Sequence, residues 1–188
     1  MITRQWKFFA DYEKEEKWLN EKVAKGFAMM HYNFCHYTFE DCVPGEYIYR
    51  IELLKNRVTH PDSVKYIHFM EDSGAEQVAS YLNWVYFRKK AADGPFEIFS
   101  DIESRIAHYQ RIVGLWIAIG CLILFAVLMQ IPAMIDLSVN NLPLSPFQVA
   151  VYVIFGPLLI LDIVCFFKFF PRYIKKVKEL KRERDIRE

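Results

Sequence analysis

The stretch that decides the fold class is residues 112–131, IVGLWIAIGCLILFAVLMQI, which carries no charge over twenty positions. A helix rises about 1.5 Å per residue, so this stretch would be about 30 Å long, the thickness of the hydrocarbon core of a bilayer. A second apolar run, residues 147–170 (FQVAVYVIFGPLLILDIVCFFKFF), is long enough to cross with some tilt, despite Asp162 and the Gly156-Pro157 pair. The sequence therefore predicts two transmembrane helices that form an α-hairpin.

The charges around these two runs predict their orientation. Basic residues precede the first run and follow the second, whereas the connecting residues 132–146 contain none. Lys and Arg are enriched on the cytoplasmic side of membrane helices. We therefore expect an extracytoplasmic loop at 132–146, both termini in the cytoplasm, and a multi-pass protein of the cell membrane. A signal peptide is not expected, because Arg4 and Lys7 lead directly into the charged run DYEKEEK.

Composition indicates that the rest of the chain folds. Of the 188 residues, 53% are apolar and 16% aromatic, which excludes a disordered protein. The 24 Lys and Arg residues nearly balance the 23 Asp and Glu residues, so the charge pattern disfavours a nucleic-acid partner. Two of the four cysteines lie in the apolar runs, and Cys35 and Cys42 would face a reducing compartment, so disulfides are not expected.

Residues 1–91 alternate between strand and helix patterns. The expected elements are a strand at 4–9, a helix from an Asp11 cap to Gly26, strands 27–40 and 47–53 joined by the turn 43–46, a helix from Pro61 to Gly74, and a strand at 78–88. This order predicts an α+β domain, a ferredoxin-like βαββαβ sandwich with both helices on one face of a four-stranded antiparallel sheet.

That arrangement would leave the other face of the sheet without a helix. Tyr47, Tyr49, Trp84 and Tyr86 are the candidate residues of this aromatic sheet face. Large apolar patches mark interfaces or ligand sites, so the face is a candidate surface for a protein partner or a homo-oligomer. The alternative interpretation is that a second copy, or the segment 92–111, simply packs there.

Residues 92–111 are expected to lead into the first membrane helix. Ser100 and Glu103 have the spacing of a capping box, and no helix breaker follows before Pro132. The linker helix and the first span would then be one continuous rod. Such a rod could transmit movement between domain and membrane, or it could serve only as a stalk.

No catalytic, cofactor or metal site is predicted. His31, Cys35, His36 and Cys42 are close in sequence, but His31 and Cys35 would lie about 13 Å apart on a strand, too far to share a zinc ion. The four glycines of the soluble part all have turn or cap roles, and no phosphate-binding, nucleophile-elbow or metalloprotease motif occurs.

Two sites remain as candidates in the membrane part. Asp162 lies about 12 Å from the cytoplasmic end of the second run, where an ionisable group is costly and often functional; a tolerated structural carboxyl is the alternative. The segment 171–188 is basic, so it is a candidate for binding anionic membrane lipids or, alternatively, a solvated helix extension. Its lipid-facing candidates are Lys175, Lys176, Lys178, Lys181 and Arg182.

Three long phrases resemble a bacterial family. They are FADYEKEEKWLNEKVAKGF at 9–27, YTFEDCVPGEYIYRIELL at 37–54 and SYLNWVYFRKKAADGPFEIFSD at 80–101, and they are similar to the family called domain of unknown function 2812. The resemblance covers most of residues 4–111. It implies an integral membrane protein, mainly of Gram-positive bacteria and often encoded beside PadR-like regulators. It implies no catalytic or binding residue, because none is established for the family.

Three functional hypotheses follow from the sequence. The first is a membrane-anchored cytoplasmic regulatory or partner-binding module that acts through the aromatic sheet face. The second is a small accessory subunit of a membrane transport or export complex that acts through the spans. The third is a membrane-bound enzyme without a recognisable motif.

Overall fold

The computed structural model describes residues 2–140 and 145–187. The chain has a mixed α+β fold and divides into two compact units, residues 1–111 and 112–188. The first unit contains six strands, two α-helices, the short 3-10 helix η1 (Ala91–Asp93) and the first turns of a third α-helix. The second unit is helical.

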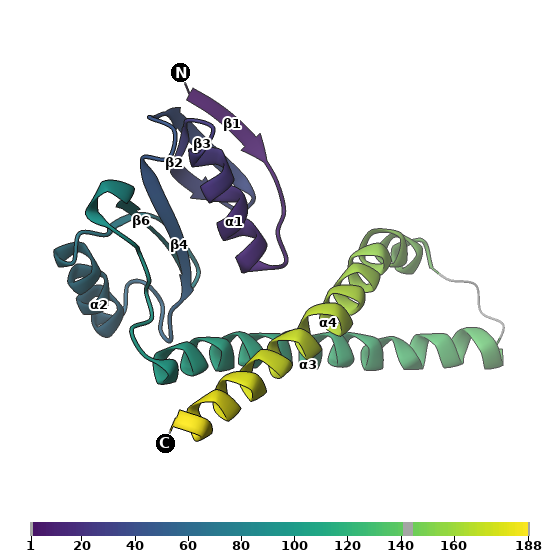
Figure 1. The fold of residues 1–188 in the computed structure, drawn as a ribbon. Coiled ribbons are helices and arrows are strands. Elements are labelled where there is room, and N and C mark those ends of the chain that lie inside the picture. Colours follow the sequence, from purple (N-terminus) through teal and green to yellow (C-terminus); the bar gives the residue numbers. More distant parts are fainter. Residues whose placement is uncertain (1, 141–144, 188) are drawn as a thin grey trace. The chain divides into compact units, whose positions relative to one another are not determined.

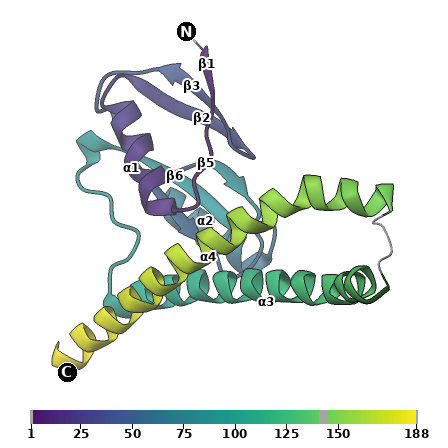
Figure 2. The ribbon, with the colours of Figure 1, turned by 90° about the vertical axis from the view of Figure 1, so that its right-hand side faces the viewer.

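Two small antiparallel sheets build the first unit (Figures 1 and 2). The first sheet has the order β1-β3-β2, and the second has the order β4-β6-β5. The elements are β1 (Ile2–Trp6), α1 (Tyr12–Val23), β2 (Phe27–Asn33), β3 (His36–Asp41), β4 (Tyr47–Leu53), α2 (Pro61–Asp72), β5 (Glu76–Tyr81) and β6 (Trp84–Lys90).

The two sheets belong to two copies of one βαββ unit. Each copy runs strand, helix, hairpin, and each places its last strand in the middle of its sheet. Gly26 and Gly74, both with positive φ after a helix, lie 48 residues apart, and the turn residues Phe34 and Leu82, also with positive φ, have the same separation. The register shifts of β2 and β5 also occur at corresponding positions. The strands β2 and β5 lie side by side where the two copies meet.

Several local predictions are confirmed. Asp11 caps α1 by accepting a hydrogen bond from the backbone N–H of Glu13, and Pro61 opens α2. At the start of the third helix the capping residue differs, because Asp101 rather than Ser100 accepts the backbone N–H of Ser104 at 2.7 Å.

The predicted strands 27–40 and 78–88 are each a tight hairpin. In both, the chain reverses at residues with positive φ that are not glycine, so the usual turn signal is missing from the sequence. The turn at 43–46 does form, with the Glu46 N–H donating to the Val43 carbonyl, but it links β3 to β4 in a different sheet. The chain therefore forms two three-stranded sheets where one four-stranded sheet was expected.

The prediction that both helices share one face is also wrong. Side chains along β6 alternate between two cores: Tyr86 packs with α1 and the first sheet, whereas Val85 and Phe87 pack with α2 and Phe96. The helices α1 and α2 thus cover opposite faces of the second sheet (Figure 1). This sheet has no open aromatic face.

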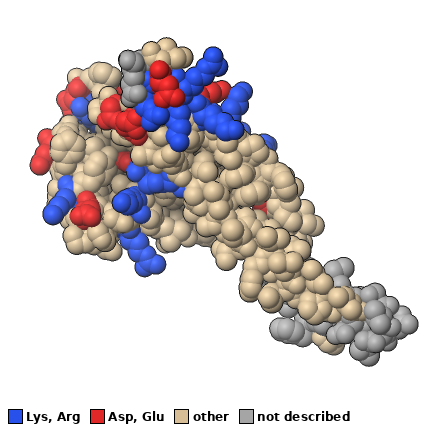
Figure 3. Space-filling model, turned by 90° about the horizontal axis from the view of Figure 1, so that it is seen from below, with Lys and Arg blue, Asp and Glu red and all other residues tan. Residues whose placement is uncertain are grey.

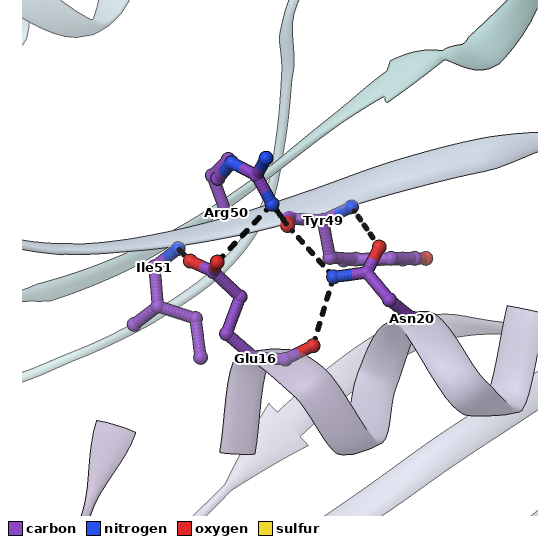
Figure 4. Close-up of polar contacts among 5 residues, drawn as sticks. All are labelled: Glu16, Asn20, Tyr49, Arg50 and Ile51. Carbon is purple, nitrogen blue, oxygen red and sulfur yellow. Dashed lines mark hydrogen bonds and ion pairs between the residues drawn. The ribbon is translucent and has the colours of Figure 1, made fainter. Parts of the chain in front are cut away.

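Polar side chains of α1 protect the outer edge of β4 (Figure 4). Asn20 bonds both backbone groups of Tyr49: its Oδ1 accepts the N–H at 2.9 Å, and its Nδ2 donates to the carbonyl at 3.1 Å. The Glu16 carboxylate accepts the N–H of Ile51 at 2.9 Å and pairs with Arg50 at 3.1 Å. An open strand edge would invite pairing with another chain, and these contacts close it.

Two long helices, α3 (Ile102–Asn140) and α4 (Pro146–Arg187), extend to the end of the described chain. The first ten residues of α3 belong to the first unit. Within the second unit the helices touch: the Trp116 and Phe169 rings stack with centroids 5.7 Å apart, and a Cβ at Gly120 would lie 2.6 Å from the Phe166 ring. Gly120 therefore permits the close approach of α4.

Among the described residues, one helical segment, Ile102–Pro132, is long and apolar enough to cross a membrane. Figure 3 shows an extended stretch of surface with almost no charged side chains. The expected loop 132–146 is shorter than predicted, because α3 continues past Pro132 to Asn140; residues 141–144 lie outside the described residues. Several side chains of the second apolar run also lie outside them.

Candidate functional site

An open cleft of about 530 Å³ lies in the first unit and is the candidate site. Its walls come from the end of β4, the loop after it, α2, the loop 98–100 and the first turns of α3. Polar and apolar groups both face it. The lining residues are Glu52, Leu54, Lys55, Asn56, Asp62, Ser63, Tyr66, Phe69, Ile98, Phe99, Ser100, Ser104, Ala107 and Arg111.

A buried carboxylate, Glu52, lies in the wall of this cleft. It occupies a position of β4 that alternation directs toward α2, on the same side as Ile48 and Leu54. The Tyr66 hydroxyl donates to one carboxylate oxygen at 2.7 Å, and Arg111 Nη2 donates to the other at 3.0 Å. Three elements, β4, α2 and α3, therefore meet at one carboxylate.

Burial shifts the acidity of this group. It raises the pKa of Glu52 above the ordinary value, while the hydrogen bond from Tyr66 and the positive charge of Arg111 act against that rise. Burial, followed by the negative charge of Glu52, raises the pKa of Tyr66 far above its ordinary range. Tyr66 is therefore a hydrogen-bond donor that stays protonated, and Glu52 is a carboxylate whose charge depends on its two partners.

Arg111 reaches the cleft from the first part of α3. Ser104, Ala107 and Arg111 are three and four residues apart, so they share one face of the helix. Arg111 has one bond to Glu52, and its buried Nε has no hydrogen-bond partner in the described part of the chain. A buried guanidinium N–H without a partner is uncommon, and an acceptor that reached it would satisfy it.

The lining determines which chemistry the cleft supports. It combines a guanidinium and an ammonium with two carboxylates, several hydroxyls and the rings of Phe69 and Phe99. It includes neither His nor Cys. A small molecule with polar groups on an apolar body fits this mixture.

A second, smaller cleft of about 300 Å³ borders the first and shares Ile98 and Phe99 with it. It contains Glu16, whose pKa is raised mainly by burial. Since Glu16 bonds the edge of β4, its position is explained by the fold. We therefore assign this cleft a structural role.

Two other buried polar groups lie outside both clefts. The Glu15 carboxylate oxygen accepts hydrogen bonds from the hydroxyls of Tyr37 and Tyr86, both at 2.7 Å, and burial raises its pKa. His108 is fully buried against aromatic rings, and neither ring nitrogen has a hydrogen-bond partner in the described chain. Burial lowers the pKa of His108 to about 3, so the ring is neutral.

The residues of the predicted aromatic sheet face lie in the core. Tyr49 and Tyr86 are buried, and Tyr47 and Trp84 are half-buried against the same cluster. The prediction of an open contact surface at these four residues is therefore wrong, because α1 and the first sheet cover it.

The predicted membrane residues all lie on α4. Asp162 is exposed. In the basic tail Lys176 is half-buried, and Lys175, Lys178, Lys181 and Arg182 are exposed; Lys175 lies 3.7 Å from Glu179 one turn further on. Within the described residues no three His, Cys, Asp or Glu side chains gather to hold a metal ion.

Sequence reasoning missed the cleft residues. A signal was present at Glu52, an acid on the inward side of an alternating strand beside Ile48 and Leu54. An inward acid needs a partner, but Tyr66 and Arg111 are 14 and 59 residues away along the chain. Only the tertiary structure brings them together.

One family model, described as "Protein of unknown function (DUF2812)", matches residues 11–121. Comparisons with curated proteins and with solved structures returned no match. The matched residues contain the complete cleft, from Glu52 to Arg111, and the first part of the apolar run.

Proposed function

The chain belongs to the DUF2812 family of proteins of unknown function. From the cleft and its link to α3 we propose that it is a membrane-anchored cytoplasmic regulatory module that binds a small ligand in the Glu52 cleft. One observation carries the proposal. The buried carboxylate in the cleft is held jointly by α2 and by Arg111, and Arg111 lies on the helix that continues as the apolar segment.

Four observations support the membrane anchor. The segment Ile102–Pro132 is apolar enough to span, and the residues that flank the two apolar runs on the outside are basic. The helices α3 and α4 pack through Trp116, Gly120, Phe166 and Phe169. An apolar groove of about 510 Å³ along this contact suits an acyl chain. We propose two spans in one hairpin, both termini in the cytoplasm, and the exposed lysines of the tail near anionic lipid headgroups.

The regulatory role follows from the link between cleft and helix. A ligand whose acceptor group reached the buried Nε of Arg111 would satisfy it, and a strong acceptor would compete with Glu52 for the guanidinium. Either change alters the contact between Arg111 and Glu52, which connects the first turns of α3 to β4 and α2. Ligand binding would therefore act directly on the helix that enters the membrane.

Membrane fractionation tests the anchor. The full chain should stay in the pellet after an alkaline carbonate wash, and protease added to intact cells should leave residues 1–111 undigested. Release by carbonate, or digestion of the amino-terminal half from outside, would contradict the proposal.

A thermal-shift screen tests the cleft. The full chain in detergent is heated with a panel of anionic, zwitterionic and neutral compounds that each carry an apolar group. We expect at least one class to raise the midpoint of the wild type and to have no effect on Ser104→Trp, which fills the cleft. Ser80→Trp, on β5 outside the cleft, is the matched control and should respond like the wild type. Equal responses of wild type and Ser104→Trp would exclude the cleft as the site.

A further inference from the structure

The tips of the two repeated hairpins display large apolar side chains to solvent. Phe34 is 61% exposed and Leu82 is 72% exposed. Both have positive φ, 35° and 55°, in the turns that connect β2 to β3 and β5 to β6.

The backbone at these tips does not favour such residues. The left-handed region suits Gly, Asn and Asp, whereas a bulky residue there is strained. Burial does not offset the strain, because both side chains are exposed. The same choice occurs at corresponding positions of both copies of the βαββ unit. Burial inside the domain therefore accounts for little of the choice of Phe34 and Leu82, and a contact outside the domain would account for both.

The two tips form one surface with the end of β1. Phe34 contacts Tyr81, the neighbour of Leu82, with ring centroids 6.0 Å apart, and the Lys7 N–H donates to the Cys35 carbonyl at 2.9 Å. Beside Lys7, two more large side chains are exposed, Trp6 at 65% and Phe8 at 58%. We call Trp6, Phe8, Phe34 and Leu82 the tip patch.

The charged residues of the segments next to the tip patch are basic. The segments 4–8, 31–38, 54–57 and 79–84 meet here: Arg4 pairs with Thr38 between β1 and β3, and the third segment joins through the Leu54 N–H, which donates to the Asn83 carbonyl at 2.8 Å. They contain Arg4, Lys7, Lys55 and Arg57 and no Asp or Glu. The remainder of residues 1–111 has 11 basic and 17 acidic residues. Positive charge is therefore concentrated where the apolar side chains are exposed.

We propose that the tip patch docks on the anionic cytoplasmic surface of a bilayer. Tryptophan and phenylalanine partition into the interface between headgroups and acyl chains, and the surrounding cations complement acidic lipids. This inference rests on the proposed membrane anchor, which holds the domain close to a bilayer. Docking would hold the domain against the membrane in addition to the tether formed by α3.

Native tryptophans allow docking and anchoring to be measured separately. The full chain is reconstituted into vesicles of phosphatidylcholine and phosphatidylglycerol in equal amounts, with phospholipids brominated near the headgroup end of the acyl chain as the quencher. Trp6→Phe removes the Trp6 signal, and Trp116→Phe removes the signal of the first span. We expect quenching of both Trp6 and Trp116, and we expect the Trp6 quenching to be lost when phosphatidylglycerol is omitted.

The turn variants exclude a folding artefact. Phe34→Asn with Leu82→Asn places a residue that tolerates positive φ at each tip, so the thermal midpoint should not fall, while the Trp6 quenching should be lost. Val43→Asn is the matched control: Val43 is 68% exposed and lies at the other end of β3, so quenching should be unchanged.

Each contrary result has one meaning. Quenched Trp116 with unquenched Trp6 overturns the docking proposal and leaves the anchor intact. Unquenched Trp116 overturns the anchor itself. A third result would also overturn the proposal: Trp6 is shielded from solvent but is not quenched by the brominated lipid, and crosslinks form between copies at the tip patch. This result would show that a second copy covers the patch.

Discussion

Replacing Asn20 by Ala should be among the most damaging single changes on the surface of α1. Asn20 accepts the N–H of Tyr49 and donates to its carbonyl, and Tyr49 is fully buried. The carbonyl keeps a second donor, Arg50 Nη1 at 3.2 Å, but no other partner of the N–H is seen in the described structure. An orphaned buried donor costs about 1–3 kcal/mol. The two lost Nδ2 bonds, to the carbonyls of Tyr49 and Glu16, cost about 1 kcal/mol together, so we expect a loss of about 2–4 kcal/mol.

Urea and thermal unfolding of the full chain in detergent measure this loss, followed by near-ultraviolet circular dichroism of the tyrosine-rich domain. A loss of 2 kcal/mol lowers the midpoint of a domain of this size by about 10 °C. Asn20→Asp keeps an acceptor for the N–H and should lose about half as much. Lys17→Ala is the control on the same helix, because the Lys17 side chain is 79% exposed, and it should stay within about 0.5 kcal/mol of the wild type. If Asn20→Ala also stayed within that range, the reasoning about the protected edge of β4 would be refuted.

Three further predictions concern His108, Glu15 and Gly120. Burial lowers the pKa of His108 to about 3, so as the pH falls below 6.5 the unfolded chain takes up a proton that the folded chain does not. The free energy of unfolding should therefore fall by about 1.4 kcal/mol per pH unit below pH 6.5. Urea titrations of His108→Phe should lack this part of the pH dependence. The pKa of Glu15 is raised by burial, so the native state holds a proton more tightly; wild type should lose stability relative to Glu15→Gln as pH rises above 4.5, and an unchanged difference across pH would contradict this. Gly120→Ala should destabilise the helical unit by about 1–3 kcal/mol in thermal unfolding, because its Cβ would overlap Phe166, whereas Gly114→Ala, with open space at that position, should have no such effect.

The cleft shows how a polar site arises from a packing constraint. The Glu52 side chain points into the domain because strand alternation places it on the same side of β4 as its apolar neighbours. A carboxylate buried in this way is stable only when hydrogen-bond donors contact it. Tyr66 supplies one donor from α2, and Arg111 supplies the other from α3. The structural need for these partners thus places a polar site at the point where α3 leaves the domain.

The sequence alone determined the local features of this protein. The Asp11 cap, the proline that opens α2 and the glycines after both helices are short-range signals, and each predicted its helix boundary correctly. The charge-free run 112–131 likewise lies in a helix that is long and apolar enough to cross a membrane. They work because helix length, capping and positive φ depend on a few neighbouring residues. Family membership was also evident from the sequence, because it rests on long contiguous phrases.

The tertiary structure alone decided the hairpins, the sheet arrangement and the site. The turns at Phe34 and Leu82 contain no glycine. The repeat with a spacing of 48 residues is therefore seen in the backbone conformation but not in the residue types. Alternation along β4 and β6 showed that each strand has two faces but could not show that α1 and α2 would cover opposite ones. The partners of Glu52 come from 14 and 59 residues away, and such pairs depend on how the whole domain packs, which no local pattern of residues contains.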